Sequence, residues 1–192
     1  MKKSILLVIL ALIVLGAFFI FLVISTENLS SFQIKFAGVI LNFRANLTEA
    51  ENISVYPDEK TLRDIILNDN VKEIGVAYIP NETENSYYLA ASYELAYKLT
   101  IINRHYFNKV KTIDSIPLNS SSDAFDMASE IKPIILLLGP TKANITSVEI
   151  YPQGYVIMAK GESFQEVNRN YTDLDLAVDK ILLVLMKNPT EN

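Results

Sequence analysis

The sequence predicts an α/β protein: an N-terminal transmembrane helix, then one three-layer α/β ectodomain with a mainly parallel sheet and a C-terminal antiparallel hairpin. Three observations lead to this fold class. Residues 5–24 form an unbroken apolar run. Strand-like and helix-like segments alternate over residues 53–138, which favours right-handed crossovers and a parallel sheet. Two apolar segments flank Pro152-Gln153-Gly154, a typical hairpin turn.

The apolar run at the N-terminus predicts a membrane anchor. Twenty helical residues span about 30 Å, the thickness of the hydrocarbon core of a bilayer. Lys2 and Lys3 precede the run, so the N-terminus is expected in the cytoplasm and the rest of the chain outside. A cleaved signal peptide is the competing interpretation, although its apolar region usually has only about 7–15 residues. The expected domains are a signal-anchor over 1–25, a stalk and N-terminal strand over 26–52, and the ectodomain over 53–192.

The first half of the ectodomain begins with alternating residues. Phe32, Ile34 and Phe36 alternate with polar residues and predict a half-buried strand, which residues 39–43 continue or pair with after Gly38. Residues 53–56 are a short strand, and Asp58 caps a helix that ends near residue 67. A strand over 73–79 precedes a long helix over about 85–103. Its apolar face is expected at four positions with helical spacing: Leu89, Tyr93, Ala96 and Thr100.

The second half contains the most apolar strand. Residues 133–138 (PIILLL) have the composition of a strand buried on both faces of a sheet. A strand over 110–113 and a short helix that begins near Ser121 come before it. Residues 148–151 and 155–159 form the hairpin. Thr172 and Asp175 resemble a capping box for a final helix to residue 186. Its apolar end, residues 181–186, is too short to cross a bilayer and is expected to be buried.

Composition excludes several kinds of chemistry. The 192 residues include no Cys and one His, which excludes disulfides, cysteine-ligated metals, thiol catalysis and any site with two imidazoles from one chain. The formal net charge of −5 argues against a nucleic-acid partner. No hydrolase, phosphate-loop, dinucleotide-binding or metalloprotease motif occurs in the sequence. We therefore expect no catalytic residues, metal or cofactor.

Asn-x-Ser/Thr sequons are strongly enriched. Random placement of the chain's 16 Asn and 24 Ser and Thr residues would give about two sequons. Clustering of these residue types in turns is the structural alternative. If several sequons carry glycans, their asparagines must lie on the surface of an extracytoplasmic domain. Seven sequons occur, at Asn28, Asn46, Asn52, Asn81, Asn119, Asn144 and Asn170.

The best candidate for a ligand site is the loop after strand 133–138. Gly139, Thr141 and Lys142 follow the central apolar strand, and ligands of open α/β sheets bind beyond the carboxyl ends of strands. Backbone N–H groups together with Lys142 could hold an anion there. The alternative is a tight turn that requires Gly and Pro for its geometry.

Three other groups have both a functional and a structural interpretation. Asp173, Asp175 and Asp179 could ligate a cation, but acidic residues also favour the first turn of a helix. His105 lies near the end of the long helix, where a cation is favourable. Tyr93 and Tyr97 could anchor an interface, yet residues at this spacing more often face the core, which is the expectation here.

Part of the sequence resembles known proteins, and this resemblance predicts where the protein is located. Pro133-Ile-Ile-Leu-Leu-Leu-Gly-Pro, then Asn144-Ile-Thr, a hairpin, and Tyr171-Thr-Asp-Leu-Asp-Leu-Ala-Val-Asp-Lys resemble uncharacterised single-pass surface proteins of archaea. The apolar strand that ends in Gly-Pro is also similar to a segment of archaeal S-layer proteins, although one Gly precedes Pro140 where that segment usually has two. The resemblance covers about the last third of the chain and implies a cell-surface location. It implies no particular activity.

Two functions follow as expectations. The favoured one is a membrane-anchored, N-glycosylated extracytoplasmic domain that contacts membrane lipid through residues 5–24 and has an envelope or partner-binding role. The alternative is a small ligand-binding or hydrolytic α/β domain that uses the loop after residues 133–138. The alternative requires that Lys142, Asn144 and a carboxylate converge on a cavity, and the favoured function does not.

Overall fold

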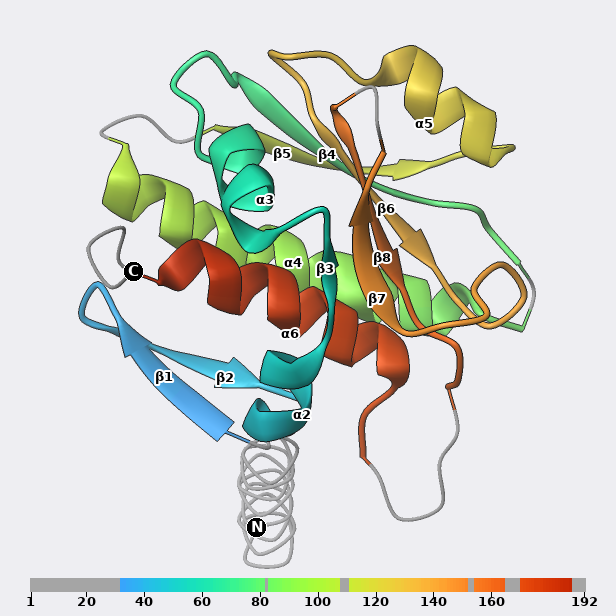
Figure 1. Ribbon diagram of the computed structural model, residues 1–192, viewed down its shortest axis with the longest axis horizontal. Coiled ribbons are helices and arrows are strands. Elements are labelled where there is room, and N and C mark those ends of the chain that lie inside the picture. Colours follow the sequence, from blue (N-terminus) through green and yellow to red (C-terminus); the bar gives the residue numbers. More distant parts are fainter. Residues whose placement is uncertain (1–31, 82, 108–110, 152–153, 165–169, 188–192) are drawn as a thin grey trace, which may run out of the picture.

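The computed structural model describes residues 32–81, 83–107, 111–151, 154–164 and 170–187 (Figure 1). Its centre is a six-stranded sheet with the strand order β3-β7-β8-β6-β4-β5. A separate two-stranded sheet precedes it, formed by β1 (Phe32–Phe36) and β2 (Val39–Phe43). The strands of the large sheet are β3 (Val55–Tyr56), β4 (Glu73–Tyr78), β5 (Thr112–Pro117), β6 (Ile134–Leu138), β7 (Ser147–Ile150) and β8 (Val156–Lys160).

Strand directions in the large sheet are mixed. β4, β5, β6 and β8 run parallel to one another, whereas β7 runs antiparallel to β8, and β3 is parallel to β7. The predicted fold class is therefore wrong, because the large sheet is mixed and the chain forms a second, separate sheet. None of the helices in the described ranges has the length and apolar composition needed to cross a membrane. The predicted transmembrane segment, residues 5–24, lies outside the described residues.

The strand β6 explains how the two faces of the large sheet are covered. All five of its residues are buried. Ile135 and Leu137 pack with the helices α3 (Glu59–Ile66), α4 (Asn85–Tyr106) and α6 (Asp173–Met186). Ile134, Leu136 and Leu138 point to the other face, where the short helix α5 (Ser121–Met127) lies. The apolar composition of this segment thus reflects burial on both sides, as predicted.

Helix α6 lies between the sheet and the N-terminal elements (Figure 1). Thr172 caps it and forms a reciprocal capping box with Asp175, which satisfies two backbone donors at the helix start. Every residue from 173 to 185 is buried. The outer side of α6 is covered by the β1–β2 hairpin and by α2 (Leu47–Asn52), which contribute Phe32, Ile34, Ala45 and Ala50. Residues 32–52, expected as a stalk and a strand, are therefore part of the packed domain.

Helix α4 turns a different face to the core from the one predicted. Its buried face includes Tyr88, Ala91, Leu95, Leu99 and Ile102. The predicted core positions Tyr93 and Tyr97 are exposed instead, so that prediction is wrong. The helix carries two stripes with the same periodicity, and periodicity alone does not identify which stripe meets the sheet.

Candidate functional site

The predicted ligand loop is a closed turn. The Gly139 N–H donates to the Tyr88 hydroxyl oxygen at 2.9 Å, and the Thr141 N–H donates to Oε1 of Glu84 at 3.2 Å. The Lys142 and Ala143 N–H groups both donate to the Gly139 carbonyl, at 2.9 and 2.8 Å. The backbone donors that could have held an anion are thus already paired.

Glu84, at the start of α4, occupies the place that an anionic ligand would take. Its Oε2 accepts hydrogen bonds from the Thr141 hydroxyl at 3.0 Å and from the Tyr88 hydroxyl at 2.8 Å. Burial, together with the hydrogen bond to Glu84, raises the pKa of Tyr88. A Cβ at Gly139 would come within 2.4 Å of the Phe164 ring, so glycine is required for this close approach. The Lys142 residue lies exposed at the rim of the turn.

The acidic residues of α6 have separate structural roles. Asp175 accepts hydrogen bonds from the N–H and hydroxyl of Thr172. Asp179 is fully buried and accepts the Ala45 N–H at 3.1 Å. Within the described part of the chain, no group of three or more His, Cys, Asp or Glu side chains could hold a metal ion. His105, at the end of α4, lies with its ring 4.9 Å from that of Phe36.

A buried charge cluster joins α4, α6 and the segment after β2, and sequence reasoning missed it. Lys98 is paired with Glu94 and lies 3.7 Å from Oδ1 of Asp179, while Arg44 Nε lies 3.4 Å from Oε2 of Glu94. Burial raises the pKa of Glu94, and burial raises the pKa of Asp179 well above its usual range. The available signal was that Lys98 continues the helical stripe of the buried residues Ala91, Leu95 and Ile102.

Beside this cluster lies a polar cavity of about 260 Å³. Arg44 and Asp175 supply its charges, and Tyr87 stacks on Phe164 at one wall with ring centroids 4.3 Å apart. Asp175 is already engaged in the capping box of α6. The cavity could accommodate a small polar group but has no nucleophile paired with a base.

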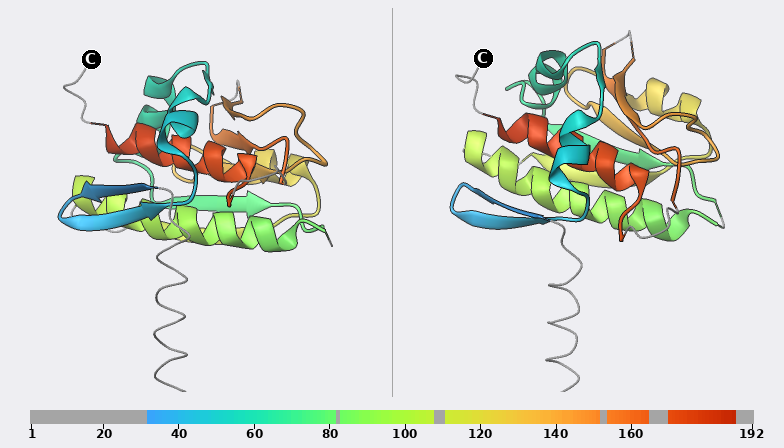
Figure 2. Two further views of the ribbon diagram at one scale, coloured as in Figure 1. Left: turned by 90° about the horizontal axis from the view of Figure 1, so that it is seen from below. Right: turned by 60° about the horizontal axis from the view of Figure 1, so that its bottom comes forward.

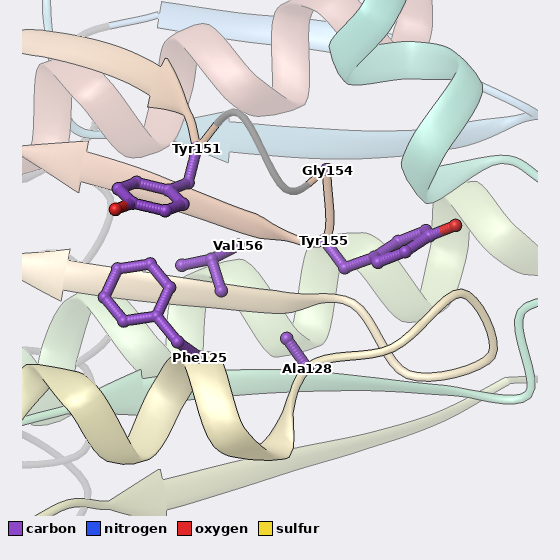
Figure 3. A pocket seen from close by; sticks show the side chains of 6 residues that line it. All are labelled: Phe125, Ala128, Tyr151, Gly154, Tyr155 and Val156. Atoms are coloured by element: carbon purple, nitrogen blue, oxygen red, sulfur yellow. The ribbon is translucent and has the colours of Figure 1, made fainter.

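A second cavity, of about 220 Å³, lies between α5 and the turn that joins β7 and β8 (Figure 3). The Phe125 and Tyr151 rings face each other with centroids 4.5 Å apart, and Val156 lies between them and Tyr155. We call this site the aromatic pocket; it is lined by Phe125, Ala128, Tyr151, Gly154, Tyr155 and Val156. The described part of its lining contains no acid, base or cation, so the aromatic pocket suits an apolar group rather than a reaction.

Five of the six described sequons lie along one edge of the large sheet. Asn81, Asn119 and Asn144 follow the carboxyl ends of β4, β5 and β6, and Asn170 follows β8. Asn52 precedes the amino end of β3, which lies at the same edge because β3 and β7 run opposite to β8. Asn46 caps the other end of α2. The turn between β7 and β8, whose residues line the aromatic pocket, lies at the opposite end of these strands.

All six of these asparagines reach the solvent. Asn81 is half-buried, and the other five are exposed. Asn28 lies outside the described residues. Several sequons also supply helix caps, since the Asn46 side chain accepts N–H groups of α2 and Thr172 caps α6. Asparagines in sequons that suit turns and helix caps are therefore also accessible to a glycan.

In comparisons with known proteins, no family model, curated protein or solved structure matches the chain.

Proposed function

We propose that this chain is an N-glycosylated extracytoplasmic domain, held at the cell membrane by residues 5–24, that binds a protein partner of the cell envelope. The observation that carries the proposal is the separation of two surfaces. Five of the six described sequons lie along one edge of the sheet, and the aromatic pocket lies at the other. Glycans on the first edge would leave the second accessible to a protein.

The aromatic pocket has the chemistry of a partner site. Clustered aromatic rings are typical of the centre of protein interfaces. The exposed Met127 and Ile131 residues extend the apolar surface from α5 toward β6. Asp126 and Glu130, also exposed, give this end acidic charge. The expected partner therefore presents an apolar side chain flanked by basic residues.

The alternative, a ligand-binding or hydrolytic domain, depends on the loop after β6. Glu84, Tyr88 and the Gly139 carbonyl pair the backbone donors at Gly139, Thr141, Lys142 and Ala143. An incoming anion would have to displace the Glu84 carboxylate from a buried network. This arrangement favours the partner-binding proposal.

A glycan placed beside the aromatic pocket tests the proposal. Met127→Asn creates a new Asn-Ala-Ser sequon at the end of α5 with one substitution. Met127→Gln introduces similar amide chemistry without a sequon and is the matched control. In the native host, chemical cross-linking of intact cells should give a discrete adduct for the wild type and for Met127→Gln. Met127→Asn should gain one glycan and lose the adduct.

Two outcomes would contradict the proposal. If Met127→Asn carries its glycan and still forms the adduct, the partner does not bind at the aromatic pocket. If neither the new sequon nor the natural ones carry glycans in the native host, the extracytoplasmic glycoprotein proposal fails.

A further inference from the structure

Half of the large hydrophobic residues that are exposed in the described structure belong to two elements, α4 and β2. On α4, Leu89, Tyr93 and Tyr97 are 54%, 76% and 51% exposed. Spacings of four residues place them on one stripe of the helix. On β2, Val39 and Ile40 are 40% and 59% exposed.

Leu89, Tyr93, Tyr97 and Ile40 lie on one side of the molecule, whereas Val39 shares the inward face of the hairpin with Leu41 and Phe43. The β1–β2 hairpin packs beside the C-terminal half of α4, where Phe36 contacts His105 and Tyr106. Leu41 and Phe43 of the hairpin are buried inward, so the outer face of the hairpin looks the other way. In both views of Figure 2, α4 and the hairpin form the same outer layer, with α6 on their inner side. We call this outer surface the α4–β2 face.

The charge of this face is opposite to that of the chain. Lys35 lies directly opposite Ile40 in the hairpin, and Arg104 continues the exposed stripe of α4. Arg44, just after β2, adds a third exposed cation. Neither strand of the hairpin contains an acidic residue, and the one acidic residue of α4, Glu94, is paired with Lys98 and largely buried. An apolar and basic face on a protein with a net charge of −5 fits an anionic surface.

The chain length before β1 indicates which anionic surface is near. Only residues 25–31 separate the apolar run from Phe32. Seven extended residues reach at most about 25 Å. If residues 5–24 enter a bilayer, Phe32, at the start of β1, is therefore held within that distance of the headgroups.

We propose that the α4–β2 face rests on the headgroup layer of the membrane to which the chain is attached. The inference depends on the proposed membrane attachment. Tyrosine suits this position because its ring is apolar and its hydroxyl is polar, as in the aromatic belts of membrane proteins. Lys35 and Arg104 then meet anionic lipid headgroups. A second copy of the chain is a poorer occupant, because a symmetric contact would bring the same cations together.

The absence of Trp from the chain allows a direct test. Full-length Tyr93→Trp, Tyr56→Trp and Phe18→Trp variants are reconstituted in vesicles of phosphatidylcholine and phosphatidylglycerol. The phospholipid is brominated near the headgroup end of the acyl chains, so that it quenches only an indole that contacts the bilayer. Tyr56, on β3, is 53% exposed and is not part of the α4–β2 face, so it is the matched control. Circular dichroism checks that each variant is folded.

We expect quenching at position 93 to exceed quenching at position 56 several-fold, and to weaken when phosphatidylglycerol is omitted. Quenching at position 18 with equal, weak quenching at positions 93 and 56 would overturn the docking of the α4–β2 face while leaving membrane attachment in place. An unquenched indole at position 18 would overturn the membrane attachment itself. A blue-shifted but unquenched indole at position 93 would mean that protein covers the face instead of lipid.

Discussion

At the scale of single residues, the buried charges explain most of the expected pH dependence of the free energy of unfolding. The cluster contains two basic residues, Lys98 and Arg44, and its Glu94 and Asp179 carboxylates lie near a third, Asp175. Asp179 is the most deeply buried of the three, and its Oδ1 has no hydrogen-bond donor in the described structure. Burial raises the pKa of Asp179, so the folded state holds this proton to higher pH than the unfolded chain does.

The free energy of unfolding should therefore decline as pH rises from about 4 through the raised pKa of Asp179, because the folded state binds more protons than the unfolded state in that window. Asp179→Asn should remove most of this decline, since an amide does not ionise. Urea unfolding between about pH 2 and pH 8 measures the effect. Asp123 is a control of opposite sign: hydrogen bonds from Ser120 lower its pKa, so Asp123→Asn should reduce a loss of stability toward acid. A variant Asp179→Asn with an unchanged pH profile would show that Asp179 is already ionised in the folded protein.

The network around Glu84 gives a second prediction for single residues. Tyr88→Phe removes the hydroxyl that accepts the Gly139 N–H and donates to Glu84. Leaving a buried N–H without a partner costs about 1–3 kcal/mol. Tyr97→Phe removes a hydroxyl from an exposed ring and should change stability by less than about 0.5 kcal/mol. Denaturant unfolding compares the two, and equal effects would contradict the role assigned to the closed turn.

At the scale of elements, sequence patterns predicted local structure better than contacts between elements. The composition of β6 identified a strand buried on both faces, and Thr172 with Asp175 identified the capping box of α6, because these signals depend on neighbouring residues. The two-residue strand β3 pairs with β7, far away in the sequence, and this pairing makes the sheet mixed. No local pattern specifies such a partner.

The same limit applies to the candidate sites. The Gly139 turn could be recognised as a turn, but its closure depends on Glu84 and Tyr88, which are more than 50 residues earlier in the chain. Glu94 and Lys98 have the spacing of a surface ion pair, and only tertiary packing buries them between α4 and α6. The aromatic pocket likewise combines α5 with the β7–β8 turn.

Helix α6 provides the prediction at this scale. Leu182 is completely buried in the main core, among side chains of the sheet and the neighbouring helices. Leu182→Ala should lower the free energy of unfolding by about 2–5 kcal/mol, since the surroundings cannot close the cavity fully. Lys187→Ala removes only an ion pair with Glu59 at the surface and should cost less than about 1 kcal/mol.

Chemical denaturation of the full-length variants in detergent measures both changes. A neutral Leu182→Ala that instead weakens attachment to the membrane or to a partner would mean that α6 is an interaction surface and not the centre of the core.

At the scale of the whole molecule, three surfaces are assigned different neighbours. The sequon edge is assigned to glycans, the aromatic pocket to a protein partner, and the α4–β2 face to lipid headgroups. The sequon edge and the aromatic pocket lie at opposite ends of the strands, so glycans and a protein partner could be present together. The arrangement requires that the described domain lies outside the cell membrane and that residues 5–24 remain attached to it.

The mass of the intact protein, purified from native membranes, tests this requirement most directly. Glycans are attached only on the extracytoplasmic side, and an uncleaved chain retains Lys2 and Lys3. We expect a mass above the 21.6 kDa of the polypeptide by several glycans, with the N-terminal segment still present. A bare mass of 21.6 kDa, or a chain that begins near residue 26, would contradict it.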